Sequence, residues 1–276
     1  MHKDLTAAFN KMIDILNTDT RCLGGWHFGS VARDMTDEYS DYDPVFLIKS
    51  KDFESFAEDI PKLMNDISDE LLICWEEGFN NDKFKNFCCA IRVGGEIHQL
   101  DIFLVNDDYQ DDFMCKLHCA GCTEKNIIFE KTGEVTSLLC KDNSITNQIP
   151  DATRAVETYL FHVIMIVKYF KRGDIFKIIK NMDILFHAHV DFLLSKYDTL
   201  NWGGWESKVK HCVPAEKQEH LKAYFTSADI ASLKAALRKA IELFESDTAE
   251  ICKAYPESKI HKIKAYFRDN LEEKCQ

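Results

Sequence analysis

Residues 29–43 read GSVARDMTDEYSDYD and lead directly into the apolar run VFLI at positions 45–48. The preceding residues 22–28, CLGGWHF, have the composition of a short strand. The predicted order is therefore strand, Gly-Ser turn, short helix, acidic loop and second strand. Because the first N–H groups of a helix lack partners within the helix, Gly29 and Ser30 are suited to hold an anion such as phosphate.

Two carboxylates stand at the start of the second strand, Asp41 and Asp43. Their spacing of two residues places both side chains on the same face of a strand. Like charges held side by side repel each other unless a cation lies between them, and Mg²⁺ prefers such oxygen ligands together with substrate phosphates. The alternatives are an ordinary turn at Gly29 and a solvated acidic loop at Asp41.

The length and composition predict a globular protein with two domains. The chain has 276 residues, of which 46% are hydrophobic. No apolar run reaches the roughly 20 residues of a membrane-spanning helix, and the first residues lack the apolar core of a signal peptide, so we expect a cytoplasmic protein with no membrane partner. The eleven cysteines are odd in number and scattered, which favours free thiols.

The formal net charge is −12. Binding a long nucleic acid depends on neutralising its phosphates with Lys and Arg, so no nucleic-acid partner is expected. An acidic protein suits a small cationic substrate better.

The first half of the chain alternates between helical and strand patterns. Apolar residues spaced by three and four predict helices over 5–16 and 52–67, with Pro61 kinking or splitting the second. Runs rich in β-branched and aromatic residues predict strands at 71–75, 84–93, 97–105, 127–129 and 135–136. Gly94 and Gly95 predict a tight hairpin turn.

Asp101 is a single carboxylate within the apolar strand 97–105. An unpaired buried carboxylate would cost several kcal/mol, so Asp101 must face something polar. The alternative is an edge strand from which Asp101 and Gln99 point to solvent.

A second candidate metal motif is Cys115, His118, Cys119 and Cys122. Structural zinc sites usually take their ligands from two separated pairs, whereas these four residues come from one short segment. The spacing therefore speaks against zinc.

Beyond Pro150 every pattern is helical, with helices expected over 153–171, 176–193, 214–225, 229–253 and 257–271. Trp202 and Trp205 flank two glycines in a predicted loop. They could line a pocket for a ring-bearing substrate or simply plug the packing between helices.

The Gly-Ser turn followed by Asp-x-Asp resembles the signature of the polymerase-β-like nucleotidyltransferases. The run 37–43, DEYSDYD, and the helical segments near 159–174 and 254–266 look like those of the aminoglycoside 6-adenylyltransferases and lincosamide nucleotidyltransferases. This resemblance implies an α+β protein: a polymerase-β-like nucleotidyltransferase domain with a mixed sheet flanked by helices at 1–149, and an all-α helical bundle that binds substrate at 150–276.

The resemblance implies Mg²⁺-dependent transfer of a nucleoside monophosphate, usually AMP from ATP, to an antibiotic hydroxyl, with release of pyrophosphate. Asp41 and Asp43 would hold Mg²⁺, and Asp101 would complete the metal site or accept the proton of the attacking hydroxyl. Phosphate contacts would come from Gly29, Ser30 and Arg33, and from Lys168 and Lys171 unless these two lysines lie on a solvated face.

One residue departs from the family pattern. Pro44 replaces the usual aliphatic residue and removes a strand N–H, which predicts a sheet edge or a bulge beside the carboxylates. No short motif identifies the acceptor. The alternatives are an enzyme of the same fold acting on a protein or RNA, and a non-catalytic nucleotide-binding module.

Overall fold

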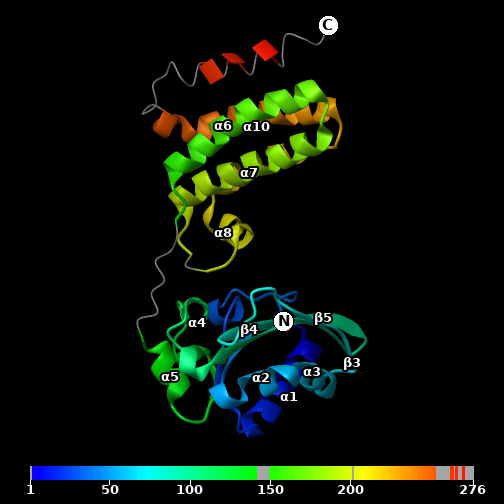
Figure 1. Cartoon of the computed structure of the whole chain (residues 1–276), viewed down its shortest axis with the longest axis vertical. Coiled ribbons are helices and arrows are strands. Elements are labelled where there is room, and N and C mark those ends of the chain that lie inside the picture. Colours follow the sequence, from blue (N-terminus) through cyan, green and yellow to red (C-terminus); the bar gives the residue numbers. More distant parts are fainter. Residues whose placement is uncertain are drawn as a thin grey trace. The chain divides into compact units, whose positions relative to one another are not determined.

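The computed structural model describes residues 2–141, 149–200, 202–252, 262–263, 265–266 and 269–270. The chain divides into two compact units, Met1–Thr146 and Asn147–Gln276. The first unit contains a sheet with helices, and the described residues of the second form helices and connecting loops (Figure 1). The protein is α+β, as predicted.

The sheet of the first unit has six strands in the order β3-β4-β5-β2-β1-β6. The β2 and β5 strands are parallel and all the other neighbours are antiparallel, so the sheet is mixed, as predicted. The strands are β1 (Cys22–His27), β2 (Pro44–Ile48), β3 (Glu70–Glu76), β4 (Phe84–Val93), β5 (Glu96–Asn106) and β6 (Ile127–Glu130).

The predicted hairpin between β4 and β5 is confirmed. Gly94 and Gly95 have φ angles of +61° and +88°, which side-chain-bearing residues rarely adopt. The turn fixes the register of β5, in which Asp101 lies opposite Cys88.

Helices cover both faces of this sheet. Figure 1 shows α1, α2 and α3 together beneath the curved β4 and β5 strands, and a second apolar cluster joins the opposite face to α4 and α5. The predicted helix over 52–67 is split at Asp59, and Pro61 lies in the first turn of α3, where its missing N–H needs no partner. The helices are α1 (Lys3–Thr18), α2 (Phe53–Glu58), α3 (Ile60–Ile67), α4 (Phe113–Cys119) and α5 (Glu134–Leu139), with single 3-10 turns at Val31–Arg33, Ser50–Asp52, Asp107–Tyr109 and Glu124–Asn126.

Two local predictions are wrong. The expected helix after Ser30 is one 3-10 turn that stops at Asp34, whose φ is +54°. The expected strand at 135–136 belongs to α5, because the Glu130 carboxylate accepts hydrogen bonds from the backbone N–H of Thr136 at 2.7 Å and from its hydroxyl at 2.6 Å. A helix start is thereby stabilised where the residue types favour a strand.

The prediction from Pro44 is also wrong. Pro44 is the first residue of β2, which lies inside the sheet between β5 and β1, and the irregularity in the β1–β2 pairing falls between Cys22 and Gly24 instead. The first residue of a strand tolerates proline because pairing with β5 starts only at Val45. The interior position of β5 equally excludes an edge strand at Asp101.

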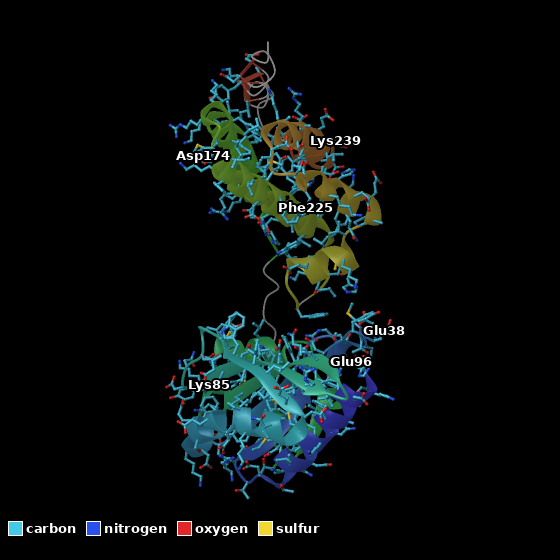
Figure 2. All side chains as sticks on the ribbon, turned by 90° about the vertical axis from the view of Figure 1, so that its right-hand side faces the viewer. Glu38, Lys85, Glu96, Asp174, Phe225 and Lys239 are labelled. Carbon is cyan, nitrogen blue, oxygen red and sulfur yellow. The ribbon has the colours of Figure 1, made fainter. Side chains whose placement is uncertain are left out.

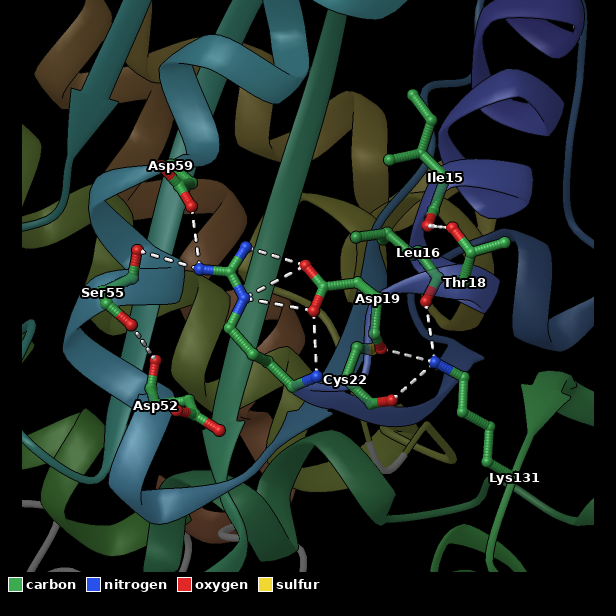
Figure 3. A network of polar contacts seen from close by, with 10 residues as sticks. Ile15, Leu16, Thr18, Asp19, Cys22, Asp52, Ser55, Asp59 and Lys131 are labelled. Carbon is green, nitrogen blue, oxygen red and sulfur yellow. Dashed lines mark hydrogen bonds and ion pairs between the residues drawn. The ribbon is translucent and has the colours of Figure 1, made fainter.

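Arg21 and Lys131 connect the start of β1 to α1 and to the residue after α2 (Figure 3). The Arg21 guanidinium donates to the carboxylates of Asp19, at 2.7 to 3.1 Å, and of Asp59, at 2.8 Å. The Lys131 ammonium donates to the backbone carbonyls of Leu16, Asp19 and Cys22 at 2.6 to 2.9 Å. These contacts hold the strand that leads into Gly29.

The described helices of the second unit share one apolar core. The α6–α7 junction has Gly173 at φ +64°, and the Asp174 carboxylate accepts from the N–H of Lys177 at 3.3 Å and so caps the start of α7. The helix α8 was not predicted, and the predicted helix over 257–271 lies largely outside the described residues. The helices are α6 (Ala152–Arg172), α7 (Ile175–Tyr197), α8 (Trp205–Cys212), α9 (Ala215–Leu221) and α10 (Ile230–Cys252), with a 3-10 turn at Lys222–Tyr224.

A buried polar network crosses this core. One carboxylate oxygen of Asp247, Oδ2, lies 3.0 Å from Nε2 of His189 and 2.8 Å from Nδ1 of His220. The Lys217 ammonium lies 2.7 Å from Oδ1 of Asp247. Although burial alone would raise the pKa of Asp247, these contacts hold it well below its usual value.

Within the described residues, no helix combines the length and apolarity needed to cross a membrane. The cysteines from Cys22 to Cys212 are free thiols, as predicted.

Candidate functional site

Three carboxylates meet in the first unit. Asp41, Asp43 and Asp101 each offer an oxygen, and these oxygens all lie within 4.8 Å of one another. Strand pairing explains the convergence, since Tyr42 bridges to Leu100 in parallel and the N–H of Asp101 donates to the Tyr42 carbonyl at 3.1 Å. The predicted cluster of Asp41, Asp43 and Asp101 is therefore present.

Alternation along the strands sets the direction of these side chains. Tyr42, Leu100 and Ile102 belong to the apolar cluster under α1, α2 and α3. Their neighbours Asp41, Asp43 and Asp101 point to the opposite face of the sheet. On this face all three carboxylates are half-buried.

Without a cation, ionisation of the three carboxylates is unfavourable. Burial and the nearby charges of Asp41 and Asp101 raise the pKa of Asp43 to about 7, against an opposing effect of Arg33. Burial also raises the pKa of Asp101, and Asp41 adds to this effect. Each shift means that the ionised carboxylate is disfavoured unless positive charge is added.

One oxygen of Asp101 fits a metal ligand. Its Oδ2 accepts a hydrogen bond from the Gln99 amide at 3.0 Å. Its Oδ1 is buried and, among the described residues, has no N–H or O–H donor in hydrogen-bonding geometry. The Cys88 thiol is only a weak donor to Asp101, so a bound cation would compensate for the buried carboxylate more fully.

The Gly-Ser turn packs directly against the carboxylates. Gly29 has a φ of +62°, and a Cβ at this position would lie 2.0 Å from Oδ2 of Asp43. The N–H of Phe28 donates to the Asp43 carbonyl at 3.1 Å, and the Ser30 carbonyl accepts from the N–H of Arg33 at 3.2 Å. The end of β1 and the start of β2 are thus held together at the site.

Arg33 is the cation of this turn. Its guanidinium donates to the carbonyls of Gly29 at 3.1 Å and Ala120 at 2.9 Å, and it lies over the Phe28 ring at 5.2 Å. Burial lowers the pKa of Arg33, while Asp43 opposes this change. A fixed positive charge therefore lies near Asp43, and the phosphate contact of Arg33 stays a prediction.

The other predicted site residues belong to the second unit. The Lys168 ammonium lies 5.1 Å from the Tyr169 ring, and Lys171 donates to the Asn270 side chain. Trp205 packs edge-on against Phe186, with ring centroids 5.1 Å apart, as part of the helical core. For this residue the contact favours a role in packing between helices over a role in lining a substrate pocket. Trp202 is half-buried.

The cysteine-rich segment has a structural role. Cys115 and Cys119 on α4, and Cys122 just after it, are buried in the apolar cluster that joins the sheet to α4 and α5. Burial lowers the pKa of His118 to about 4, and its Nδ1 lies 2.7 Å from the Met114 carbonyl.

The sequence reasoning missed a second group of metal-capable residues, His2, Glu96 and His98, whose ligand atoms also lie within 4.8 Å of one another. Glu96 and His98 alternate along β5 after the hairpin turn, which places them on one face. Only the fold brings His2 to them, since it lies before α1.

The sequence matches no protein-family model and no curated protein. The functional assignment therefore depends on the geometry of the carboxylates and of the turn beside them.

Proposed function

We propose that this protein is a Mg²⁺-dependent nucleotidyltransferase that moves a nucleoside monophosphate, AMP from ATP, to a hydroxyl of a small antibiotic of the aminoglycoside or lincosamide type. Pyrophosphate is the second product. The single observation that supports this proposal most is the convergence of Asp41, Asp43 and Asp101 beside the Gly29 turn. In this proposal the first unit is a polymerase-β-like domain and the second a helical bundle that binds the acceptor.

The residues present fit Mg²⁺. Mg²⁺ is held in proteins by a few carboxylates together with waters and substrate phosphates. Asp41, Asp43 and Asp101 supply such oxygens, and the raised pKa values of Asp43 and Asp101 reflect the cost of ionisation without a cation. When bound, the ion would neutralise negative charge on the triphosphate.

The turn would orient the triphosphate. Gly29 has no side chain, so the turn can lie directly against the Asp43 carboxylate, and the triphosphate would lie beside both. The Ser30 hydroxyl would donate to a phosphate oxygen. Arg33, held by two carbonyls, would add positive charge without a large loss of side-chain entropy.

Asp101 would take one of two roles within this proposal. In the first, its Oδ1 binds the ion, because that oxygen is buried without an N–H or O–H donor among the described residues. In the second, Asp101 stays free of the ion and accepts the proton of the attacking hydroxyl, for which its raised pKa makes it a stronger base than an ordinary carboxylate.

The test is a transfer assay with ATP labelled at its α-phosphate in the presence of Mg²⁺. Streptomycin, other aminoglycosides, clindamycin, total RNA and lysate protein are offered separately as acceptors. We expect label on an antibiotic and release of pyrophosphate. Label on RNA or protein would support nucleotidyl transfer but contradict an antibiotic as the acceptor. Absence of both label transfer and pyrophosphate release would overturn the proposal.

The matched variants are Asp43→Asn and Asp66→Asn. Asp43→Asn removes one charge from the carboxylate cluster, whereas Asp66 is exposed on α3. Transfer should be lost only in Asp43→Asn, while both variants keep the fold.

A further inference from the structure

A second group of metal-capable side chains lies at the N-terminal edge of the first unit. His2 precedes α1, and Glu96 and His98 follow the hairpin turn at the start of β5. Nε2 of His2 lies 3.5 Å from Oε2 of Glu96, and the two imidazole rings have centroids 4.8 Å apart. Ligand atoms of all three residues lie within 4.8 Å of one another.

The imidazoles have unused ring nitrogens. Among the described residues, Nδ1 of His2 and Nε2 of His98 are buried and have no hydrogen-bond partner. A buried nitrogen without a partner loses its water without compensation, which costs free energy. Coordination of a cation by Nε2 of His98 would remove this cost.

An outer carboxylate is also present. Oδ2 of Asp4 lies 4.0 Å from Nδ1 of His2, on the other side of the ring from Glu96. At this distance Asp4 accepts no hydrogen bond from the ring, but its negative charge would favour a cation bound at Nε2 of His2. Asp4 itself is held close to the hairpin, since a Cβ at Gly94 would lie 2.5 Å from its Oδ2.

The three residues line a cavity of about 560 Å³ that they share with Glu38, Asp41 and Gln99. Figure 2 shows Glu38 and Glu96 on the same side of the first unit. The lining of this cavity therefore includes Asp41 of the carboxylate cluster as well as the two histidines.

We propose that His2, Glu96 and His98 form a second metal site that binds Zn²⁺ and is separate from the carboxylate site. Two imidazoles and one carboxylate are a typical ligand set for Zn²⁺, whereas Mg²⁺ prefers oxygen ligands alone. Three protein ligands leave one coordination position, which would face the cavity and accept water or a donor atom of a bound molecule.

The test is Zn²⁺ binding by the full chain without a histidine tag, measured by competition with a chromophoric chelator. We expect wild-type protein and His211→Ala, which changes an exposed histidine on α8, to bind Zn²⁺ equally. His98→Ala and Glu96→Gln should each weaken binding by at least about tenfold. Unchanged affinity in both variants would overturn the proposal.

Two further measurements separate this site from the carboxylate cluster and from misfolding. Asp43→Asn should keep Zn²⁺ binding and the visible absorption of bound Co²⁺, and loss of both in this variant would assign the metal to the carboxylates instead. Without added metal, Glu96→Gln should unfold at the wild-type temperature. The proposal stands independently of nucleotidyl transfer.

Discussion

Oδ2 of Asp43 lies where a side chain on residue 29 would begin: a Cβ at Gly29 would be 2.0 Å from it. This contact joins the turn after β1 to the residue directly before β2. Glycine is required here both for its φ of +62° and for the space that the carboxylate occupies.

Gly29→Ala should therefore displace Asp43 and lower the transfer rate by about a hundredfold, because small misplacements of catalytic groups are costly. Gly133→Ala is the matched control, since Gly133 also has a positive φ, +82°, but no atom within 4 Å of its Cβ position. Backbone strain should cost each variant about 1–2 kcal/mol of stability, and the collision with Asp43 should add to this loss only in Gly29→Ala. Equal transfer rates in the two variants would contradict the proposed role of this contact.

Stability should depend on pH through Asp43. Its pKa of about 7 lies above the unfolded value of 3.8, so the native state binds more protons between these values. Without a divalent cation, the free energy of unfolding should then fall as pH rises from about 4 to about 7, by at most about 1.4 kcal/mol per unit of pH from this group. Asp101, whose pKa is also raised, contributes in the same direction.

Mg²⁺ should reverse this loss, because it competes with the proton for the carboxylates. We expect the unfolding temperature to increase more with Mg²⁺ at about pH 8 than at about pH 5.5. Asp43→Asn should reduce both the pH dependence and the Mg²⁺ effect. An equal Mg²⁺ effect at the two pH values would contradict the titration of Asp43.

Arg33→Gln keeps a polar N–H donor at this position but removes the positive charge and shortens the side chain that reaches the carbonyls of Gly29 and Ala120. The KM for ATP should increase about tenfold, which corresponds to the loss of one charge-assisted hydrogen bond of ~1.5 kcal/mol. Arg92→Gln, which breaks an exposed ion pair with Glu70, serves as the control. Steady-state kinetics of both variants measure the difference, and an unchanged KM in Arg33→Gln would exclude a phosphate contact.

Asp247→Ala should destabilise the second unit by about 3–5 kcal/mol, because His189, His220 and Lys217 lose a shared buried acceptor. The pKa of Asp247 is lowered in the fold, so its contribution is present above about pH 4 and is lost as the pH falls below that value. Asp183→Ala, at a half-exposed position on α7, should change stability by less than about 0.5 kcal/mol. Denaturant unfolding measures both, and equal values would contradict this role of the network.

The elements that the sequence predicted well are those with a strong local signal. Gly94 and Gly95 determine the hairpin through their backbone freedom, and the apolar spacing of α6 and α7 determines two long helices. The errors at Pro44 and Thr136 have a common cause. In both cases a contact that the residue types do not reveal decides the conformation. Pairing with β5 begins only after Pro44, and the Glu130 carboxylate, six residues before Thr136, accepts the Thr136 N–H.

The site could be predicted only in part from local pattern. The spacing of Asp41 and Asp43 predicts one pair of carboxylates, but the position of Asp101 depends on the parallel pairing of β2 with β5, and it was expected only from the family resemblance. The proximity of His2 to Glu96 and His98 could not be predicted either. No sequence pattern connects His2 to these two residues, which are more than ninety residues away.

The most direct measurement is Mg²⁺-dependent release of pyrophosphate from ATP, with acceptor present, in wild-type protein, Asp43→Asn and Asp101→Asn. We predict that wild-type protein releases pyrophosphate and that each substitution lowers the rate by at least about a hundredfold with the fold intact. Rates equal to wild type in both variants would contradict the assignment of these carboxylates as the centre of a nucleotidyltransferase.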